Sequence, residues 1–224
     1  LNYWRKEDIM LVTNFPYEFA GVKTIEVGDE NICPFYMYSG KINTFIDLYN
    51  KGLITETCWY HDFDAYQLEP LGEVNLEGVD VGFTDYGYRL NWNGGSSFLK
   101  PGAKDIFVWM KKLMYAHPDK TLVNHIEAYK AYSDEVAIKK LTDQNVNNIN
   151  ARIKRINISY NFNLNPLTIK NCYEQAIKPI KVLHCHQHRL KKSKFGQDLF
   201  NKNLIYLGVY LIILATLIGA TSLF

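Results

Sequence analysis

Two carboxylates follow a short β-prone run, with one residue between them. They are Asp62 and Asp64, and the run before them is TCWY, residues 57–60. Carboxylate oxygens are the ligands that Mg²⁺ and Mn²⁺ prefer, and a cation held there would neutralise charge on a departing diphosphate. We therefore interpret Asp62 and Asp64 as metal ligands. The alternative is that they are solvated carboxylates of a turn.

A second group of metal-binding side chains follows a later apolar run. The run is IKVL, residues 180–183, and after it come His184, Cys185, His186 and His188. On an extended chain the three histidines project to one side. Mn²⁺ accepts an imidazole nitrogen beside oxygen ligands, so we predict that His184 or His186 completes the metal site. The alternative is a set of surface histidines beside a basic linker.

Two further segments have residue types suited to ligand contact. Asn93, Gly94 and Gly95 form a glycine-rich turn through which the backbone can approach a donor or acceptor closely, although an ordinary loop has the same composition. Lys41 lies at the start of an expected helix, where it can face a diphosphate or point into solvent. We include all four residues in the predicted donor and acceptor site.

An acidic pair follows a helix N-cap residue. Ser133 is a favourable N-cap, and Asp134 and Glu135 stand in the first turn after it. We predict Asp134 as the catalytic carboxylate. Both acids also suit the positive end of a helix dipole, which is the structural alternative. The sequence contains no P-loop, GxSxG or HExxH motif, so nucleotide hydrolase, serine hydrolase and zincin mechanisms have no motif support.

Strand and helix patterns alternate along the chain. Short apolar or alternating runs predict strands at residues 8–14, 22–27, 57–60, 79–84, 97–99 and 180–184. Apolar residues at helical spacing predict helices over residues 39–53 and 103–116, and from residue 133 onward. This order predicts an α/β sandwich with a mainly parallel sheet. Ligands bind at the carboxyl ends of strands in such sheets, so Asp62 and His184 are expected to meet at one edge.

The C-terminal end has a different composition from the rest of the 224-residue chain. Residues 204–224 contain no charged residue, and a helix of that length spans a bilayer core of about 30 Å. Lysines and one arginine dominate the charge of the preceding segment, 189–203, and favour the cytoplasmic side. We expect a single-pass transmembrane helix at 204–224, a basic linker at 189–203 and a catalytic domain at 1–188 facing the cytoplasm. The alternative for 204–224 is a buried core helix.

Charge and cysteine content narrow the choice of partners and compartment. The net charge of +2 gives no reason to expect a nucleic-acid partner. The four cysteines are Cys33, Cys58, Cys172 and Cys185, and their scattered spacing suits reduced thiols in a cytoplasm-facing protein. The membrane is therefore the expected macromolecular partner.

The order of these motifs resembles one enzyme class. The segments are TNF (13–15), CWYHDFDAYQ (58–67), NGGSSF (93–98), SDE (133–135), ISYNF (158–162) and KPIKVLHCH (178–186). Together they resemble the GT-A glycosyltransferases, particularly the type related to glycogenin and bacterial galactosyltransferases. The resemblance implies a Rossmann-type sandwich, a nucleotide-diphospho-sugar donor and a hydroxyl acceptor. It also implies Mn²⁺ or Mg²⁺ bound by Asp62, Asp64 and a late histidine.

The sequence also departs from that class. Residues 1–8 resemble the end of the helix after the family's first strand, so that strand is expected to be missing from domain 1–188. A C-terminal anchor is not a general family feature either. Two other hypotheses follow: a membrane-anchored structural or interaction protein on a degenerate glycosyltransferase scaffold, and a metal-dependent hydrolase that uses the same acidic and histidine residues.

Overall fold

The computed structural model describes residues 3–33, 36, 39–62, 65–87, 91–116, 125–164 and 168–184. The α-helices in these ranges are α1 (Gly40–Asn50), α2 (Lys104–Tyr115), α3 (His125–Tyr132), α4 (Asp134–Asp143) and α5 (Ile169–Gln175). The strands are β1 (Leu11–Thr13), β2 (Glu18–Phe19), β3 (Val22–Glu26), β4 (Cys58–His61), β5 (Ala65–Gln67), β6 (Val81–Asp85), β7 (Trp92–Leu99), β8 (Ile153–Ile156), β9 (Phe162–Asn163) and β10 (Val182–His184). The short 3-10 helices are η1 (Lys6–Asp8), η2 (Asp29–Asn31), η4 (Pro101–Ala103), η5 (Val146–Arg152) and η6 (Ile158–Tyr160).

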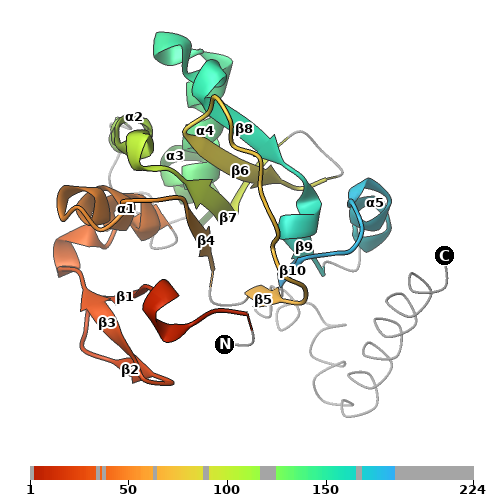
Figure 1. Cartoon of the computed structure of the whole chain (residues 1–224). Helices are drawn as coiled ribbons and strands as arrows, with labels where there is room; N and C mark the ends of the chain where they lie inside the picture. Colours follow the sequence, from red (N-terminus) through yellow and green to blue (C-terminus); the bar gives the residue numbers. More distant parts are fainter. Residues whose placement is uncertain are drawn as a thin grey trace.

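The described strands form three small sheets, with strand orders β1-β3-β2, β4-β7-β6-β8 and β5-β10-β9. In Figure 1 helices α1 to α4 gather beside the four-stranded sheet, and α5 lies next to β9 and β10. The β1-β3-β2 sheet extends from the lower left of the same view. The fold is therefore mixed α/β.

The pairing of the strands is mixed, and the predicted mainly parallel sheet is wrong in this respect. In the four-stranded sheet β7 pairs antiparallel with both β4 and β6, and β8 pairs parallel with β6. The difference arises at β7, which is eight residues long and begins at Trp92. The sequence pattern predicted a strand only at 97–99, because Asn and Gly have low β-propensity.

The main core lies between the four-stranded sheet and the helices. Helices α1, α2 and α4 contribute apolar side chains at helical spacing, and the sheet contributes side chains from β6, β7 and β8. The buried helix members are Ile42, Phe45 and Leu48 from α1, Ile106, Phe107, Met110 and Met114 from α2, and Ala137, Ile138 and Leu141 from α4. This core fixes the directions in which the N-terminal ends of α1 and α4 point.

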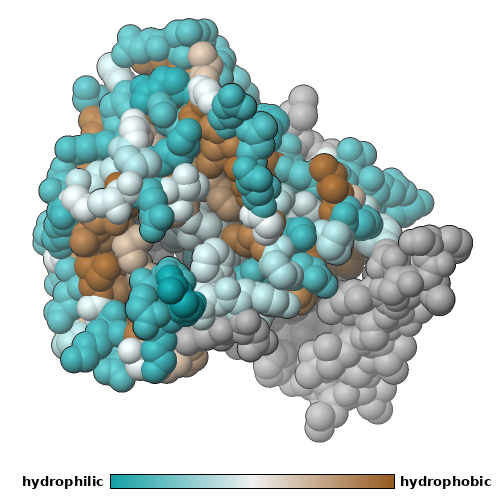
Figure 2. All heavy atoms as spheres, in the orientation of Figure 1, coloured by the Kyte–Doolittle hydropathy of each residue, from teal (hydrophilic) through white to brown (hydrophobic). Residues whose placement is uncertain are grey.

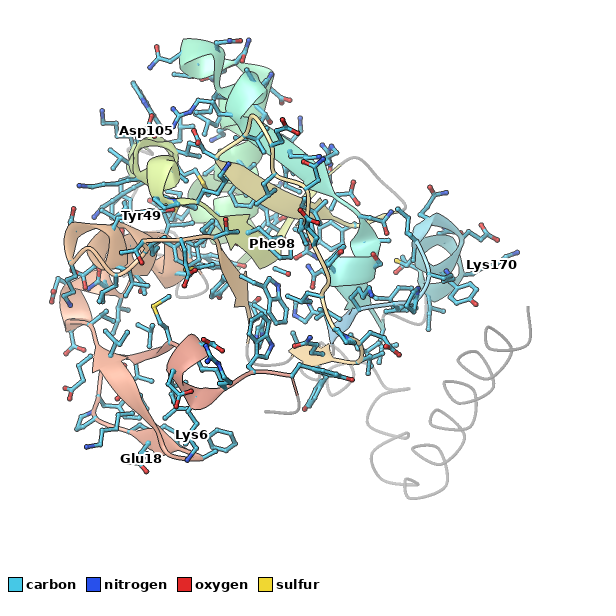
Figure 3. All side chains as sticks on the ribbon, viewed as in Figure 1. Lys6, Glu18, Tyr49, Phe98, Asp105 and Lys170 are labelled. Carbon is cyan, nitrogen blue, oxygen red and sulfur yellow. The ribbon has the colours of Figure 1, made fainter. Side chains whose placement is uncertain are left out.

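A second apolar layer lies on the other side of β7. Phe98 and Ile156 from the four-stranded sheet pack with Ala65 and Val182 from the β5-β10-β9 sheet. Figure 3 places the labelled Phe98 near the middle of the molecule. On the face seen in Figure 2, apolar residues form small patches separated by polar ones. The four-stranded sheet and the β5-β10-β9 sheet are thus joined through buried apolar contacts of Phe98 in β7 and Ile156 in β8.

The predicted helices are present with small shifts of their ends. The helix expected over 39–53 is α1, the helix expected over 103–116 is α2, and Ser133 caps α4 by accepting a hydrogen bond from Glu135 N. The N-terminal residues expected to end a helix contain only the 3-10 turn η1. Within the described ranges, none of the helices combines the length and apolarity needed to cross a bilayer. The predicted anchor at 204–224 and linker at 189–203 lie outside those ranges.

Candidate active site

The site is built where the ends of β4 and β10 approach the middle of β7. Asp62 follows β4, and its backbone N–H donates to Gly95 O at 2.9 Å. His184 is the last residue of β10, and its Nε2 lies 4.0 Å from Asp62 Oδ2. The structure thus brings Asp62 and His184 together, as the strand ends predicted, although the two strands belong to different sheets. Asp64 and His186 lie outside the described residues.

Lys41 from the first turn of α1 links two carboxylates. Its Nζ lies 3.2 Å from Asp62 Oδ1 and 3.3 Å from Asp134 Oδ2, and it donates to Gly94 O at 2.9 Å. Burial lowers the pKa of the Lys41 ammonium, but the negative charges of Asp134 and Asp62 beside it hold this pKa well above its usual value. Lys41 is therefore a fixed, charged member of the site.

The two oxygens of Asp62 have different surroundings. Oδ1 accepts hydrogen bonds from Tyr60 OH at 2.5 Å and from Lys41 Nζ, while Oδ2 faces His184. Burial raises the pKa of Asp62, but Lys41, Tyr60 and His184 together outweigh it, so the pKa lies below its usual value. Burial also raises the pKa of Tyr60, which keeps its hydroxyl protonated as a donor. Asp62 is thus an anion held through Oδ1.

A hydrogen-bonded chain fixes the imidazole of His184. Thr84 Oγ1 donates to Ser96 O at 3.0 Å, so it must accept from Asn161 Nδ2, which lies 3.0 Å away. This orientation leaves Asn161 Oδ1 as the acceptor for His184 Nδ1, at 2.8 Å. Nδ1 therefore carries a hydrogen, and Nε2 is on the side of Asp62. An imidazole fixed in this way through its other nitrogen is the usual arrangement of a metal-binding histidine.

The glycine-rich segment is a buried bulge of β7 and not the flexible turn that its composition suggested. In the register of β6 with β7, Phe83 pairs with Ser97 and the next residue, Thr84, pairs with Asn93. The residues between Asn93 and Ser97 are extra in β7, which is the geometry of a β-bulge. A Cβ on Gly94 would lie 2.1 Å from Asp134 Oδ2. Glycine is required here because the carboxylate packs directly on the backbone.

Gly95 has the same role toward the histidine. A Cβ on Gly95 would lie 2.4 Å from His184 Cε1. Its N–H donates to Asn93 Oδ1 at 2.8 Å, while Asn93 Nδ2 is buried without a hydrogen-bond partner within the described part of the chain. A buried donor of this kind at a site is one that a bound ligand can satisfy. Asn93 and Gly95 thus lie beside His184, and Gly94 lies beside Asp134.

Asp134 and Glu135 have separate environments at the start of α4. Asp134 is 5% exposed, and its N–H donates to Ser39 Oγ at 3.0 Å, which joins the N-terminal ends of α1 and α4. Glu135 accepts from Tyr86 OH and Tyr129 OH, both at 2.7 Å, and weakly from Gly94 N at 3.4 Å. Burial, with Asp134 beside it, raises the pKa of Glu135. Asp134 therefore belongs with Asp62 to the group of charges around Lys41. Glu135 instead contacts the backbone of the bulge at Gly94.

Sequence patterns did not identify several of these supporting residues. Tyr60, Asn161 and Ser39 bind the predicted site residues directly, yet each reads as an ordinary member of a strand, a buried loop or a helix start. Asn161 had the clearest signal, since it is the amide within the mainly apolar and aromatic segment ISYNF. Within the described residues, no group of three or more His, Cys, Asp or Glu side chains is arranged to hold a metal ion. Of the four predicted metal ligands, Asp62 and His184 lie within the described residues.

Comparisons with known proteins give little further guidance. No protein-family model matches the sequence, and no curated protein matches it. One solved structure, described as the "crystal structure of a glycosyltransferase involved in the glycosylation of the major capsid of PBCV-1", is similar with a TM-score of 0.47 and 13% identity. The similarity covers 72% of this chain and 76% of that chain. A similarity of this size assigns neither a family nor an activity to this chain.

Proposed function

We propose that this protein is a metal-dependent glycosyltransferase that moves a sugar from a nucleotide-diphosphate donor to a hydroxyl acceptor. The observation that carries the proposal is the approach of Asp62 Oδ2 and His184 Nε2, 4.0 Å apart, with His184 Nδ1 held by Asn161 Oδ1 on the other side of the ring. Two side chains supplied by two separate strand ends, each fixed by its own hydrogen bonds, support the proposed metal site.

The residues present fit a divalent cation, with Mn²⁺ favoured over Mg²⁺. Mg²⁺ prefers oxygen ligands alone, whereas Mn²⁺ accepts a nitrogen ligand among oxygens. We propose Asp62 and His184 as ligands, and Asp64 and His186 stay predicted ligands. When bound, the cation supplies Lewis acidity toward the diphosphate leaving group.

Lys41 and the helix ends would bind the same anionic group. The N-terminal ends of α1 and α4 meet at Ser39, and helix N-termini favour negative charge. Lys41 adds a largely buried cation, held in place by ion pairs with Asp62 and Asp134 and by a hydrogen bond to Gly94 O. In the transfer, the bond between the anomeric carbon and the diphosphate oxygen breaks, and a bond from that carbon to the acceptor oxygen forms. We assign Lys41 to the leaving diphosphate.

Asp134 is the proposed carboxylate beside the reacting sugar. Its Oδ2 packs against Gly94 and pairs with Lys41, so it can accept a hydrogen bond from a sugar hydroxyl next to the glycine backbone. The acceptor hydroxyl loses its proton as the new bond forms, and Asp134 is our candidate to receive it. Asn93 Nδ2, which is buried and has no hydrogen-bond partner among the described residues, is the proposed donor to a sugar oxygen.

Calorimetric titration of the full chain with UDP and GDP, with and without Mn²⁺, tests the proposal. We expect binding that requires Mn²⁺ and is lost in Asp62→Asn. Asp143→Asn is the matched control, since Asp143 lies at the exposed end of α4 and pairs with Lys139. Nucleotide binding that is absent from the well-folded protein, or unchanged in Asp62→Asn, would contradict the proposal.

One observation favours a second function, that of a membrane-anchored interaction protein on a degenerate glycosyltransferase scaffold. Lys41 already balances Asp62 and Asp134, so the carboxylate cluster is compatible with a fold that needs no metal. In that case Mn²⁺ would leave the thermal midpoint unchanged, whereas a metal that binds the native state raises it.

A further inference from the structure

Strand β4 has aromatic side chains on both of its faces. Tyr60 points into the main core, where its ring packs edge-on against Phe45 with centroids 4.9 Å apart. Trp59 and His61, one residue to either side, lie on the opposite face because strand side chains alternate. Their ring centroids are 4.5 Å apart. The residue directly after His61 is Asp62, so this second aromatic face reaches the candidate active site.

A third ring joins this face from the N-terminal segment. The rings of Trp4 and Trp59 are stacked, with centroids 6.2 Å apart and planes inclined by 25°. We name Trp4, Trp59 and His61 the aromatic stack. Trp4 is 39% exposed and His61 is exposed as well, so the stack is open to solvent beside Asp62.

Hydrogen bonds hold Trp4 in this exposed position. Its Nε1 donates to Gln67 Oε1 at 2.6 Å, and the preceding Tyr3 donates from its hydroxyl to Leu68 O at 2.8 Å. Both acceptors lie at the end of β5, more than sixty residues away in sequence. A large apolar ring that is fixed before binding loses little side-chain entropy when a ligand arrives. The N-terminal segment thus builds a rigid surface at the edge of the site.

The aromatic stack presents the faces of its rings to a ligand, because the indole N–H groups of Trp4 and Trp59 and the Nδ1 of His61 already have partners. Trp59 Nε1 donates to Ser96 Oγ at 2.9 Å, and His61 Nδ1 contacts Asp62 O at 2.8 Å. A nucleobase is recognised through hydrogen bonds at its edge as well as through stacking. The C–H face of a pyranose needs mainly an apolar ring to pack against, and the stack supplies that surface without charge from its two indoles.

We propose that the aromatic stack binds a pyranose ring of the acceptor, with Trp4 as the ring that contacts it. The inference rests on the proposed function, because that function is what makes the bound sugar an acceptor. Trp4 is then a specificity-determining residue on the face of β4 opposite Lys41. The charged cluster takes the diphosphate of the donor, and the aromatic stack takes an uncharged sugar unit of the acceptor on the other face of β4.

Saturation-transfer NMR on the full chain tests this inference. The probes are methyl β-D-galactoside, methyl β-D-glucoside and methyl α-D-mannoside, with uridine and guanosine as nucleobase probes. We expect at least one pyranoside to receive saturation at C–H protons of one ring face. Its affinity should fall about tenfold in Trp4→Ala, the size of one lost stacking contact. Trp4→Phe keeps a ring and should retain most of the binding.

Phe19→Ala is the matched control. Phe19 is 58% exposed and follows Glu18, which Figure 3 places at the tip of the N-terminal hairpin, so this variant removes a more exposed ring from another place. The inference is overturned if no pyranoside responds, if Trp4→Ala binds as the wild type does, or if uridine or guanosine is the probe that Trp4→Ala loses. Near-UV circular dichroism shows whether Trp4→Ala is folded.

A parallel titration of the wild-type protein with UDP, GDP and Mn²⁺ separates the two proposals. Pyranoside binding that depends on Trp4 without any nucleotide binding would refute the transferase proposal and keep a sugar-binding surface. Nucleotide binding without pyranoside binding would do the reverse.

Discussion

The carboxylate of Asp134 packs directly on the backbone of Gly94. A Cβ built on Gly94 would lie 2.1 Å from Asp134 Oδ2 and 3.4 Å from Lys41 Nζ. The carboxylate at the start of α4 is therefore positioned by a residue of β7 that has no side chain. This contact explains why a segment of poor β-propensity occupies the interior of a buried strand.

Gly94→Ala should disturb both stability and ligand binding. The added methyl group must displace Asp134, whose neighbours are buried, so we expect a loss of about 1–3 kcal/mol in the free energy of unfolding. We also expect loss of Mn²⁺-dependent nucleotide binding. Urea unfolding and calorimetry measure the two effects.

The control for this change is Gly28→Ala. A Cβ on Gly28 would meet the carboxylate of Glu30, an exposed side chain that can move aside. Its effect on the free energy of unfolding should stay within about 0.5 kcal/mol. A Gly94→Ala protein as stable as Gly28→Ala would show that Asp134 is not held against this backbone.

Asn161→Ala should weaken metal binding through His184. The change leaves the buried Nδ1–H of His184 without its acceptor, at a cost of about 1–3 kcal/mol in stability. Metal affinity should fall by about 10–100-fold, since the ring orientation is no longer fixed. Asn43→Ala is the control: Asn43 is buried and bonded to Asn31 O and Tyr115 OH, so its loss should cost stability and leave Mn²⁺ affinity intact. Equal Mn²⁺ affinity in the two variants would contradict the role of Asn161.

The lowered pKa of Asp62 predicts an acid-sensitive contribution to stability. A carboxyl whose pKa is lower in the folded state stabilises the fold above its unfolded pKa, near 3.8, and loses that contribution as the pH falls through its folded pKa. The difference in thermal midpoint between wild type and Asp62→Asn should therefore be largest near neutral pH and shrink below about pH 4. Thermal melts over that range measure it. A difference that grows on acidification would refute the ion pair with Lys41.

Residues 204–224 are expected to anchor the protein to a membrane. Deleting them should move the chain from the membrane fraction to the soluble fraction, because no charged residue interrupts this segment. Leu211→Arg is a milder variant that should weaken insertion, since arginine near a span centre is costly. A deletion variant that stays with the membrane, or that unfolds, would remove the basis for this anchor.

Local patterns predicted the helices better than the sheet. Helix α4 was found from its Ser133 cap and α1 from its apolar spacing, because both signals are local. The first half of β7 was missed because its residues have low β-propensity, and packing of Asp134 and His184 on Gly94 and Gly95 decides its conformation. The role of Asn161 could not be derived from its own segment, since it depends on contacts with Thr84 and His184, which lie far away in sequence.

The long sequence distances between the residues that contact β7 also affect how the protein folds. Lys41, Asp62, Asp134 and His184 come from widely separated parts of the chain and all meet at two adjacent peptide units of one strand. Contacts of such long range form late in folding, because the loops between them must close first. A ribosome-bound or truncated chain that lacks β10 would have no His184 to complete the cluster. Ligand binding at this site would thus report on completed folding of the whole domain.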